Sequence, residues 1–216
     1  MKNLIIFDLD GTLLDTIADL AASTNHALEA FGFPTHPIEA YNYFVGNGIN
    51  KLFERALPEG AQTEANIQKI RSAFIPYYDV HNHDLSKPYA GIPELLSALQ
   101  AKGLQLAVAS NKYQAATEKL IAYYFPEIHF ISVLGQREGI PAKPDAGIVR
   151  DSMRRAGVLE AATLYVGDSN VDMQTARNAG VDAVGVTWGF RPLAELEAYH
   201  PRYIAREPAD ILTFLG

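Results

Sequence analysis

The sequence predicts an α/β fold, a Rossmann-like doubly wound parallel sheet that carries an inserted all-helical cap domain. Apolar runs typical of buried strands alternate with segments of helical spacing at the N-terminus and again after residue 88, and such alternation is typical of βαβ units. No strand-like run lies between Thr16 and Pro88. We therefore expect residues 1–15 and 88–216 to form the α/β core and residues 16–87 to form the helical cap.

The first strand and the helical insert follow from the spacing of apolar residues. Leu4 to Phe7 is an uninterrupted apolar run and predicts a buried strand. Apolar positions between Ile17 and Phe31 repeat with helical spacing, and Gly32 then ends that helix. Further helical patterns lie near residues 38–45, 49–56 and 67–74.

After residue 88 the predicted helices and strands alternate along the chain. Pro93 suits the first turn of a helix that follows Gly91, and Gly103 suits its C-terminal cap. The remaining expected elements are strands at 104–109, 130–134, 163–166 and 183–187 and helices at about 113–124, 145–156 and 171–179. Because helical crossovers bring the carboxyl ends of parallel strands to one edge of the sheet, we look for a site among the residues at those ends.

Composition limits the classes of protein to be considered. The chain has 216 residues, 48% of them hydrophobic, and a formal net charge of −7, which fits a globular protein and argues against nucleic-acid binding. It contains no cysteine, which excludes disulfides and thiolate zinc sites. No signal peptide precedes the first strand and no apolar run approaches 18 residues, so we expect a cytoplasmic protein with no membrane partner.

Two acids follow the first predicted strand directly. Asp8 and Asp10 carry like charges, and at ~4 Å and an effective dielectric of ~20 such charges repel by about 4 kcal/mol. Gly11 permits a sharp turn there, and Thr12 adds a hydroxyl. A simple Asp-Gly turn is the alternative interpretation. A pair of acids at a buried strand end is more typical of a place where a cation, a proton or a reaction needs them.

The ends of other predicted strands supply complementary groups. Ser110 and Asn111 follow the 104–109 strand, and Asp168 follows the 163–166 strand, with Asp172 one helical turn further on. Lys143 lies at the expected start of the helix near 145. Taken singly, the lysine could be a surface residue and the serine a helix cap. Together, clustered acids beside one lysine suit phosphoryl chemistry if a divalent cation is present, and Mg²⁺ prefers such oxygen ligands.

These segments resemble the motifs of the haloacid dehalogenase superfamily over nearly the whole chain. Residues 8–13 (DLDGTL) resemble its first motif, 110–112 (SNK) the second, 143–144 (KP) the third and 167–172 (GDSNVD) the fourth. Ala146 stands where the third motif usually has a second proline. The helical insert is similar to a C1-type cap. Three further segments, 44–48, 55–57 and 187–190, resemble phosphoglycolate phosphatases.

The resemblance implies a Mg²⁺-dependent phosphatase that acts on a small phosphorylated metabolite, with 2-phosphoglycolate as the best candidate. It implies that Asp8 is the nucleophile, which forms an aspartyl-phosphate, and that Asp10 is the general acid and base. It also implies that Asp8, the backbone carbonyl of Asp10 and Asp168 bind Mg²⁺, with Asp172 close to the ion. The phosphate-binding residues that it implies are Thr12, Ser110, Asn111 and Lys143.

Other functions remain open from the sequence. A sugar phosphomutase uses the same core, although the cap shows no residues that we recognise as typical of a mutase. A phospho-aspartate signalling module also combines an aspartate, Mg²⁺, a hydroxyl and a lysine, but its phosphorylated aspartate belongs to a middle strand. The acid at Asp10 disfavours dehalogenases and phosphonatases. We expect the cap to act as a lid with hinges near Thr16 and residues 87–91, in a monomer or a homodimer.

Overall fold

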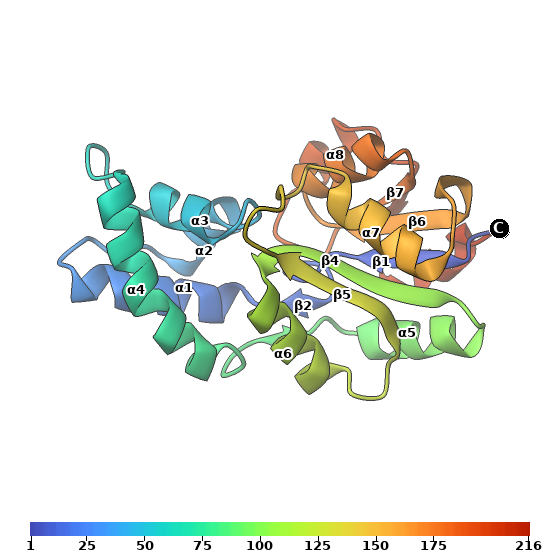
Figure 1. Cartoon of the computed structure of the whole chain (residues 1–216), viewed down its shortest axis with the longest axis horizontal. Helices are drawn as coiled ribbons and strands as arrows, with labels where there is room; N and C mark the ends of the chain where they lie inside the picture. The colour runs from blue at the N-terminus through green and yellow to red at the C-terminus, as the bar shows by residue number, and fades with distance from the viewer.

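The computed structural model describes residues 1–216 and consists of an α/β core with a helical insert beside it (Figure 1). The core contains a six-stranded sheet in the order β5-β4-β1-β6-β7-β8, and every pairing in it is parallel. Its strands are β1 (Leu4–Phe7), β4 (Gln105–Tyr113), β5 (Phe130–Gln136), β6 (Thr163–Gly167), β7 (Asp182–Val186) and β8 (Tyr203–Ala205). The predicted doubly wound α/β fold with an inserted helical cap is confirmed.

Helices cover both faces of the sheet, because the side chains of each strand alternate between two apolar clusters. Ile5 and Phe7 face a cluster that includes α5 (Ile92–Ala101), α6 (Gln114–Tyr124) and the 3₁₀ segment η2 (Pro208–Phe214). Leu4 and Ile6 face the opposite cluster. The helices on that side are α7 (Gly147–Ala156), α8 (Asn170–Ala179) and α9 (Leu193–Glu197). A strand buried on both faces reads as continuously apolar, as residues 4–7 do.

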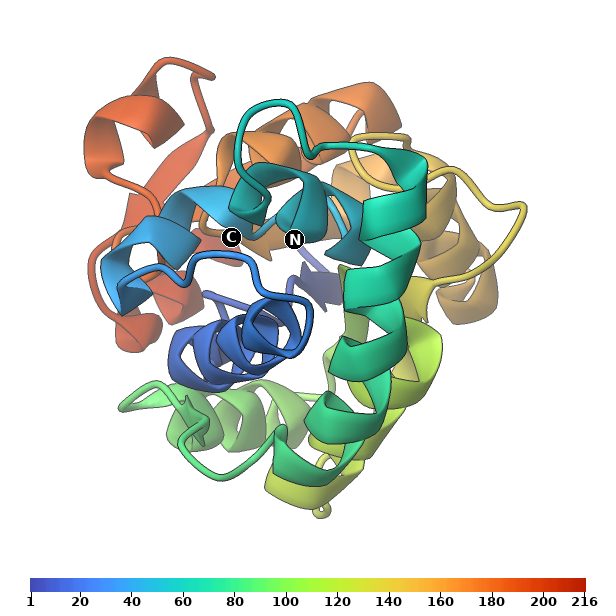
Figure 2. The same cartoon turned by 90° about the vertical axis from the view of Figure 1, so that its left-hand side faces the viewer.

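The insert consists of four helices packed around an apolar centre of their own. They are α1 (Ile17–Ala30), α2 (Ile38–Phe44), α3 (Ile49–Ala56) and α4 (Glu64–His81). Phe53 and Phe74 meet edge to face with ring centroids 5.0 Å apart, and Phe74 stacks on Tyr78 at the same distance. Figure 2 shows the long helix α4 crossing in front of the sheet end, with α2 and α3 beside it. The helices therefore stand over one edge of the sheet.

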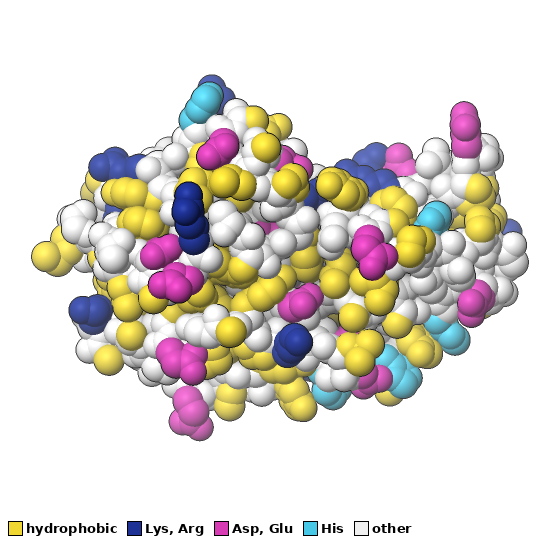
Figure 3. Space-filling model, turned by 180° about the vertical axis from the view of Figure 1, so that it is seen from behind, with side chains coloured by type: hydrophobic (Ala, Val, Ile, Leu, Met, Phe, Trp, Pro, Cys, Tyr) yellow, Lys and Arg dark blue, Asp and Glu magenta, His cyan; other side chains and the backbone are white.

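Two short strands connect the insert to the core. β2 (Leu14–Asp15) pairs antiparallel with β3 (Lys87–Pro88), so the chain leaves and re-enters the core at one point. Seen from behind, the surface is hollowed between the core and the insert (Figure 3). No helix in the chain combines the length and the apolar character that a membrane span requires.

Several expected boundaries differ from the structure. The strand expected at 104–109 continues to Tyr113, so its helix begins one residue later. The helix expected from about 145 begins at Gly147, and Lys143 therefore lies in the loop before it rather than at its start. The sixth strand, β8, was not expected, because its three residues are too few to show an alternation.

Candidate active site

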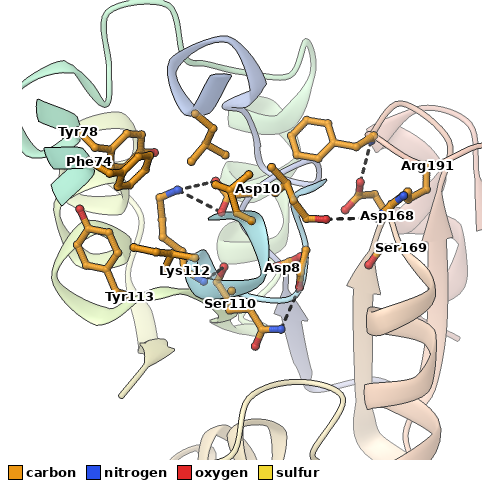
Figure 4. A pocket seen from close by; sticks show the side chains of 18 residues that line it. Asp8, Asp10, Phe74, Tyr78, Ser110, Lys112, Tyr113, Asp168, Ser169 and Arg191 are labelled. Atoms are coloured by element: carbon orange, nitrogen blue, oxygen red, sulfur yellow. Dashed lines mark hydrogen bonds and ion pairs between the residues drawn. The ribbon is translucent and has the colours of Figure 1, made fainter. Parts of the chain in front are cut away.

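Three neighbouring strands bring the predicted site residues to one edge of the sheet. β1 lies between β4 and β6, and Phe7 is in register with Val108 and Val166. Asp8 and Asp168 directly follow β1 and β6, while Ser110 lies two residues beyond Val108 in β4. Residues that are more than a hundred positions apart in the sequence are thereby grouped around one pocket (Figure 4).

The carboxylate of Asp8 is held through one of its oxygens. Its Oδ1 accepts a hydrogen bond from the backbone N–H of Leu9 at 2.7 Å and lies 2.9 Å from Nζ of Lys143. Both contacts use Oδ1, and Asp8 lines the pocket, so Oδ2 is the oxygen available to a ligand. Burial, followed by the charge of Asp172, raises the pKa of Asp8 to about 7, although Lys143 lowers it.

Lys143 is the cation at the base of this site, with 1% of its side chain exposed. Its Nζ lies 2.8 Å from Oδ1 of Asp172 and 3.1 Å from the hydroxyl oxygen of Tyr165. Burial opposes its charge, but Asp172 and then Asp8 outweigh this effect and hold the pKa of Lys143 well above its usual value. Asn111 fixes the lysine backbone, since its side chain accepts from the Lys143 N–H at 2.8 Å and donates to the Lys143 carbonyl at 3.1 Å.

Asp172 is fully engaged by protein groups. Its Oδ2 accepts from the backbone N–H of Ser169 at 3.1 Å and from the Ser169 hydroxyl at 2.6 Å. Its Oδ1 accepts from Lys143 and, at 3.2 Å, from the hydroxyl of Tyr165. Because both oxygens already have donors, Asp172 is suited to hold the lysine in place, and its place close to a cation stays a prediction.

Asp168 is enclosed by backbone from two loops. Its Oδ2 accepts from the N–H of Phe190 at 2.8 Å, and its Oδ1 lies 3.3 Å from the hydroxyl of Thr12. A Cβ atom at Gly189 would lie 2.3 Å from Cβ of Asp168 and 2.3 Å from the carbonyl oxygen of Gly11, so only glycine fits there. Burial, and then the charges of Asp172 and Asp8, raise the pKa of Asp168 well above its usual value.

The three acids form a cluster that could hold a divalent cation. Asp8, Asp168 and Asp172 each offer an oxygen within 4.8 Å of the others, and all three are buried. Lys143 is the ammonium that contacts two of them, so the cluster keeps an excess of negative charge. Hard carboxylate oxygens and unbalanced negative charge are what a divalent cation of the Mg²⁺ type requires. The donor set therefore fits such an ion.

Asp10 lies on the other side of Asp8 and has a cationic partner that the sequence analysis missed. Its Oδ1 is 2.9 Å from Nζ of Lys112 and accepts from the Thr16 hydroxyl at 2.7 Å. Lys112 also lies 3.2 Å from Oδ2 of Asp10, and its side chain is only 3% exposed. Figure 4 shows the lysine pointing at the aspartate. The lysine is part of the SNK segment, so its position at a strand end was the available signal.

The other predicted residues lie as follows. Ser110 and Asn111 line the pocket beside Asp8. The Thr12 side chain is fully buried, with its hydroxyl directed at Asp168, and it does not line the pocket. A phosphate-binding role for Thr12 therefore stays a prediction. Lys143 lies beneath the pocket against Asp8.

The insert closes the pocket from above. Leu20, Ile49, Leu52 and Phe74 contribute apolar side chains, and the loop that holds Gly46 contributes backbone. The core and the insert also bond across the pocket. Asn111 donates from Nδ2 to the Gly46 carbonyl at 3.0 Å, and Arg191 donates to the Val45 carbonyl at 3.2 Å. A molecule bound in the pocket would therefore contact both parts of the chain.

Comparison with known proteins gives consistent matches. The sequence model of the haloacid dehalogenase-like hydrolase family matches residues 5–186. A phosphoglycolate phosphatase of Agrobacterium fabrum is 37% identical over 201 residues, covering 91% of this chain and 86% of the relative. One from Vibrio parahaemolyticus is 31% identical, covering 97% and 94%. The solved structure of a predicted phosphoglycolate phosphatase from Haemophilus somnus 129PT is 30% identical, with a TM-score of 0.92 over 100% of this chain and 98% of that one.

The parallel sheet, the acids at its strand ends and these matches define an enzyme of the phosphoric monoester hydrolase class. The chain belongs to the haloacid dehalogenase-like hydrolase family. The resemblance of its four motifs and its helical insert to that family and to phosphoglycolate phosphatases is thereby confirmed.

Proposed function

We propose that this chain is a Mg²⁺-dependent phosphatase that hydrolyses a small phosphate monoester through an aspartyl-phosphate on Asp8. One observation carries the proposal: Leu9 and Lys143 hold Oδ1 of Asp8, while Oδ2 is left for the pocket. A carboxylate held in this way attacks phosphorus in line with the departing oxygen. Phosphorus gains a bond to Asp8 as its bond to the alcohol oxygen breaks.

Asp10 carries the protons in both halves of the proposed reaction. Its carboxyl lines the pocket, 11% exposed, and Thr16 and Lys112 fix its orientation. In the first half it gives a proton to the departing alkoxide. In the second half it takes a proton from the water that attacks the aspartyl-phosphate, which releases phosphate and restores the carboxylate of Asp8.

The phosphoryl oxygens are held by groups at the ends of β4 and in the loop before α7. We assign this role to the Ser110 hydroxyl, the backbone N–H of Asn111 and the ammonium of Lys143. Asp8, the backbone carbonyl of Asp10 and Asp168 would bind the Mg²⁺ ion. When bound, the ion offsets the charge of the acid cluster and of the phosphoryl oxygens in the transition state.

The insert acts as a lid in this proposal, with residues 16–87 as the cap and residues 1–15 and 88–216 as the core. The paired strands β2 and β3 form the only two-stranded connection between them and are the proposed hinge. The bonds from Asn111 to Gly46 and from Arg191 to Val45 hold the lid down. Closure excludes bulk water, so that the intermediate reacts with the water that Asp10 activates.

The proposed substrate is 2-phosphoglycolate, which would be converted to glycolate and phosphate. Relatives named phosphoglycolate phosphatase match 91% and 97% of the chain, and so include the insert as well as the core. The insert supplies the apolar part of the pocket wall, where the alcohol portion of an ester would lie. Agreement across the insert supports the substrate as well as the reaction.

Phosphate release across a panel of phosphate monoesters tests this function. The panel includes 2-phosphoglycolate and sugar phosphates, with Mg²⁺ or with a chelator, for the wild type and Asp8→Asn. We expect Mg²⁺-dependent release, fastest from 2-phosphoglycolate and lost in Asp8→Asn. Faster phosphate release from another ester would identify that ester as the better substrate and would leave the proposed reaction unchanged. Transfer of phosphate between positions of a sugar without release would identify a mutase instead.

A further inference from the structure

One part of the pocket wall has no role in the phosphatase mechanism beyond its contact with Asp10. Lys112 reaches the pocket from the end of β4, and Figure 4 shows Phe74 and Tyr78 of the insert beyond it, on the side away from Asp168. Its ammonium lies 4.8 Å from the centroid of the Tyr78 ring. The Lys112 ammonium thus lies between Asp10, the proposed acid for the leaving oxygen, and Tyr78 of the insert.

The wall around this ammonium is apolar. Leu20, Ile49, Leu52 and Phe74 line the pocket from the insert, and none of them can accept a hydrogen bond. Arg191 is the other cation in the lining, but its guanidinium is 5.0 Å from the Tyr43 ring centroid and donates to the Val45 carbonyl. Lys112 is therefore the cation that faces the space for the alcohol portion of the substrate.

The hydroxyl of Tyr78 adds a second donor to the same pocket. Four buried side-chain atoms have no hydrogen-bond partner within the chain, and of their residues only Tyr78 lines the pocket. The Tyr78 side chain is 0% exposed, and burial raises its pKa well above the usual value, so the hydroxyl keeps its proton. A buried hydroxyl without a partner is costly, which favours a ligand atom that accepts its hydrogen bond.

We propose that Lys112 and Tyr78 form a subsite for a carboxylate on the carbon next to the ester oxygen, with Lys112 as the residue that determines specificity for it. This inference rests on the proposed phosphatase function and deepens it. The Lys112 ammonium can only donate and is positively charged, and the protonated Tyr78 hydroxyl offers a second donor, so the subsite favours an anion and rejects an ammonium group. The substrate class is then the phosphate esters of 2-hydroxy acids, of which 2-phosphoglycolate is the smallest.

The reach of the lysine agrees with this assignment. Asp10 protonates the ester oxygen in the proposed mechanism, and Nζ of Lys112 lies 2.9 Å and 3.2 Å from its two carboxylate oxygens. In a 2-hydroxy acid ester the carboxylate is attached to the carbon bonded to that same ester oxygen. An ammonium beside Asp10 is therefore within reach of a group two bonds further along the substrate.

The test compares two esters that differ only in the carboxylate, 2-phosphoglycolate and ethyl phosphate. The value of kcat/KM is measured for both with the wild type, Lys112→Met, Lys112→Arg and Tyr78→Phe. Lys119→Met is the matched control, because Lys119 is an exposed lysine of α6 outside the pocket. Displacement of Asp10 in a Lys112 variant would slow the hydrolysis of both esters by the same factor. That effect therefore cancels in the ratio of the two kcat/KM values.

We expect Lys112→Met to lower the preference for 2-phosphoglycolate by roughly 30- to 100-fold, the loss typical of a hydrogen bond to a charged group. Tyr78→Phe should lower it by about 3- to 10-fold, as for a neutral donor, without lowering the thermal midpoint, since the hydroxyl has no partner to lose. Lys112→Arg should keep part of the preference, and Lys119→Met all of it.

If Lys112→Met lowers kcat/KM by the same factor for both esters, the subsite is overturned and Lys112 only positions Asp10. A wild type that hydrolyses both esters equally well would also overturn the subsite, while the phosphatase reaction would stand. A wild type that releases phosphate from neither ester or from any other would overturn the proposed function itself.

Discussion

Replacing Asp8, the proposed nucleophile, should make the metal-free protein more stable while it removes activity. In the folded chain the pKa of Asp8 is about 7, compared with 3.8 for an ordinary aspartate, because burial and Asp172 outweigh Lys143. Between these two values the folded state holds a proton that the unfolded state has lost, so stability falls as the pH rises through this window. Asp8→Asn removes this titrating group, so the variant should not show this loss of stability between the two pKa values.

The size of the effect follows from the same values. A rise from 3.8 to about 7 corresponds to roughly 4 kcal/mol of unfavourable free energy once Asp8 is ionised in both states. Roughly 2 kcal/mol of this arises between pH 5 and pH 7, and the rest of the change above pH 5 is complete by about pH 8. The stability difference between Asp8→Asn and the wild type should therefore grow by about 3 kcal/mol from pH 5 to pH 8.

Urea denaturation in the presence of a chelator measures this difference. Both proteins are unfolded at pH 5 and at pH 8, and the midpoints are compared at equal m-values, so that the change reports stability alone. The charge of Asp8 also contributes to the raised pKa of Asp168, so removing that charge in Asp8→Asn adds to the stability difference in the same direction. A stability difference that stays constant with pH, or that shrinks toward pH 8, would refute the assignment of Asp8 as a buried carboxylate held at an electrostatic cost.

Three further changes test other parts of the site. Gly189→Ala should abolish phosphate release and weaken Mg²⁺ binding, because the new Cβ would lie 2.3 Å from Cβ of Asp168 and displace that carboxylate. Calorimetry measures the Mg²⁺ affinity, and an unchanged affinity would contradict the expected displacement of Asp168. Lys143→Met should lower the free energy of unfolding at pH 8 by about 3–5 kcal/mol, because it leaves the buried carboxylates of Asp8 and Asp172 without their cation. A loss below about 1 kcal/mol in urea denaturation would argue against that pairing. Thr16→Val should lower kcat by about tenfold with little change in KM, because it removes one of the two groups that orient Asp10 and leaves only Lys112. An unchanged kcat would argue against that role of Thr16.

The residues that the sequence could predict are those whose place depends on strand ends alone. Asp8 and Asp168 directly follow apolar runs. Helical crossovers bring the carboxyl ends of parallel strands to one edge of the sheet, whatever the order of the strands within it. The order itself places β1 between β4 and β6, which the local pattern does not encode. Their grouping was therefore predictable, while the distances within the group depend on the packing of both faces of the sheet.

Other parts of the site depend on contacts that no local pattern reveals. Tyr78 belongs to α4 and meets Lys112 only because the insert folds back over the sheet edge. Lys143 was expected at a helix start, but the side chain of Asn111 bonds its backbone and keeps it in the loop before α7. Lys112 stood in a recognised segment without an assigned role, since its contact with Asp10 depends on the turn after β1.

In the proposed reaction Asp8 itself receives the phosphoryl group. The most direct measurement is a single turnover with 2-phosphoglycolate and Mg²⁺, quenched in acid within milliseconds, followed by mass spectrometry of the N-terminal peptide. We expect a transient mass gain of one phosphoryl group, located at Asp8 rather than Asp10, that decays as phosphate appears. Phosphate released with no modified peptide at any time, or a phosphoryl group located on another residue, would contradict it.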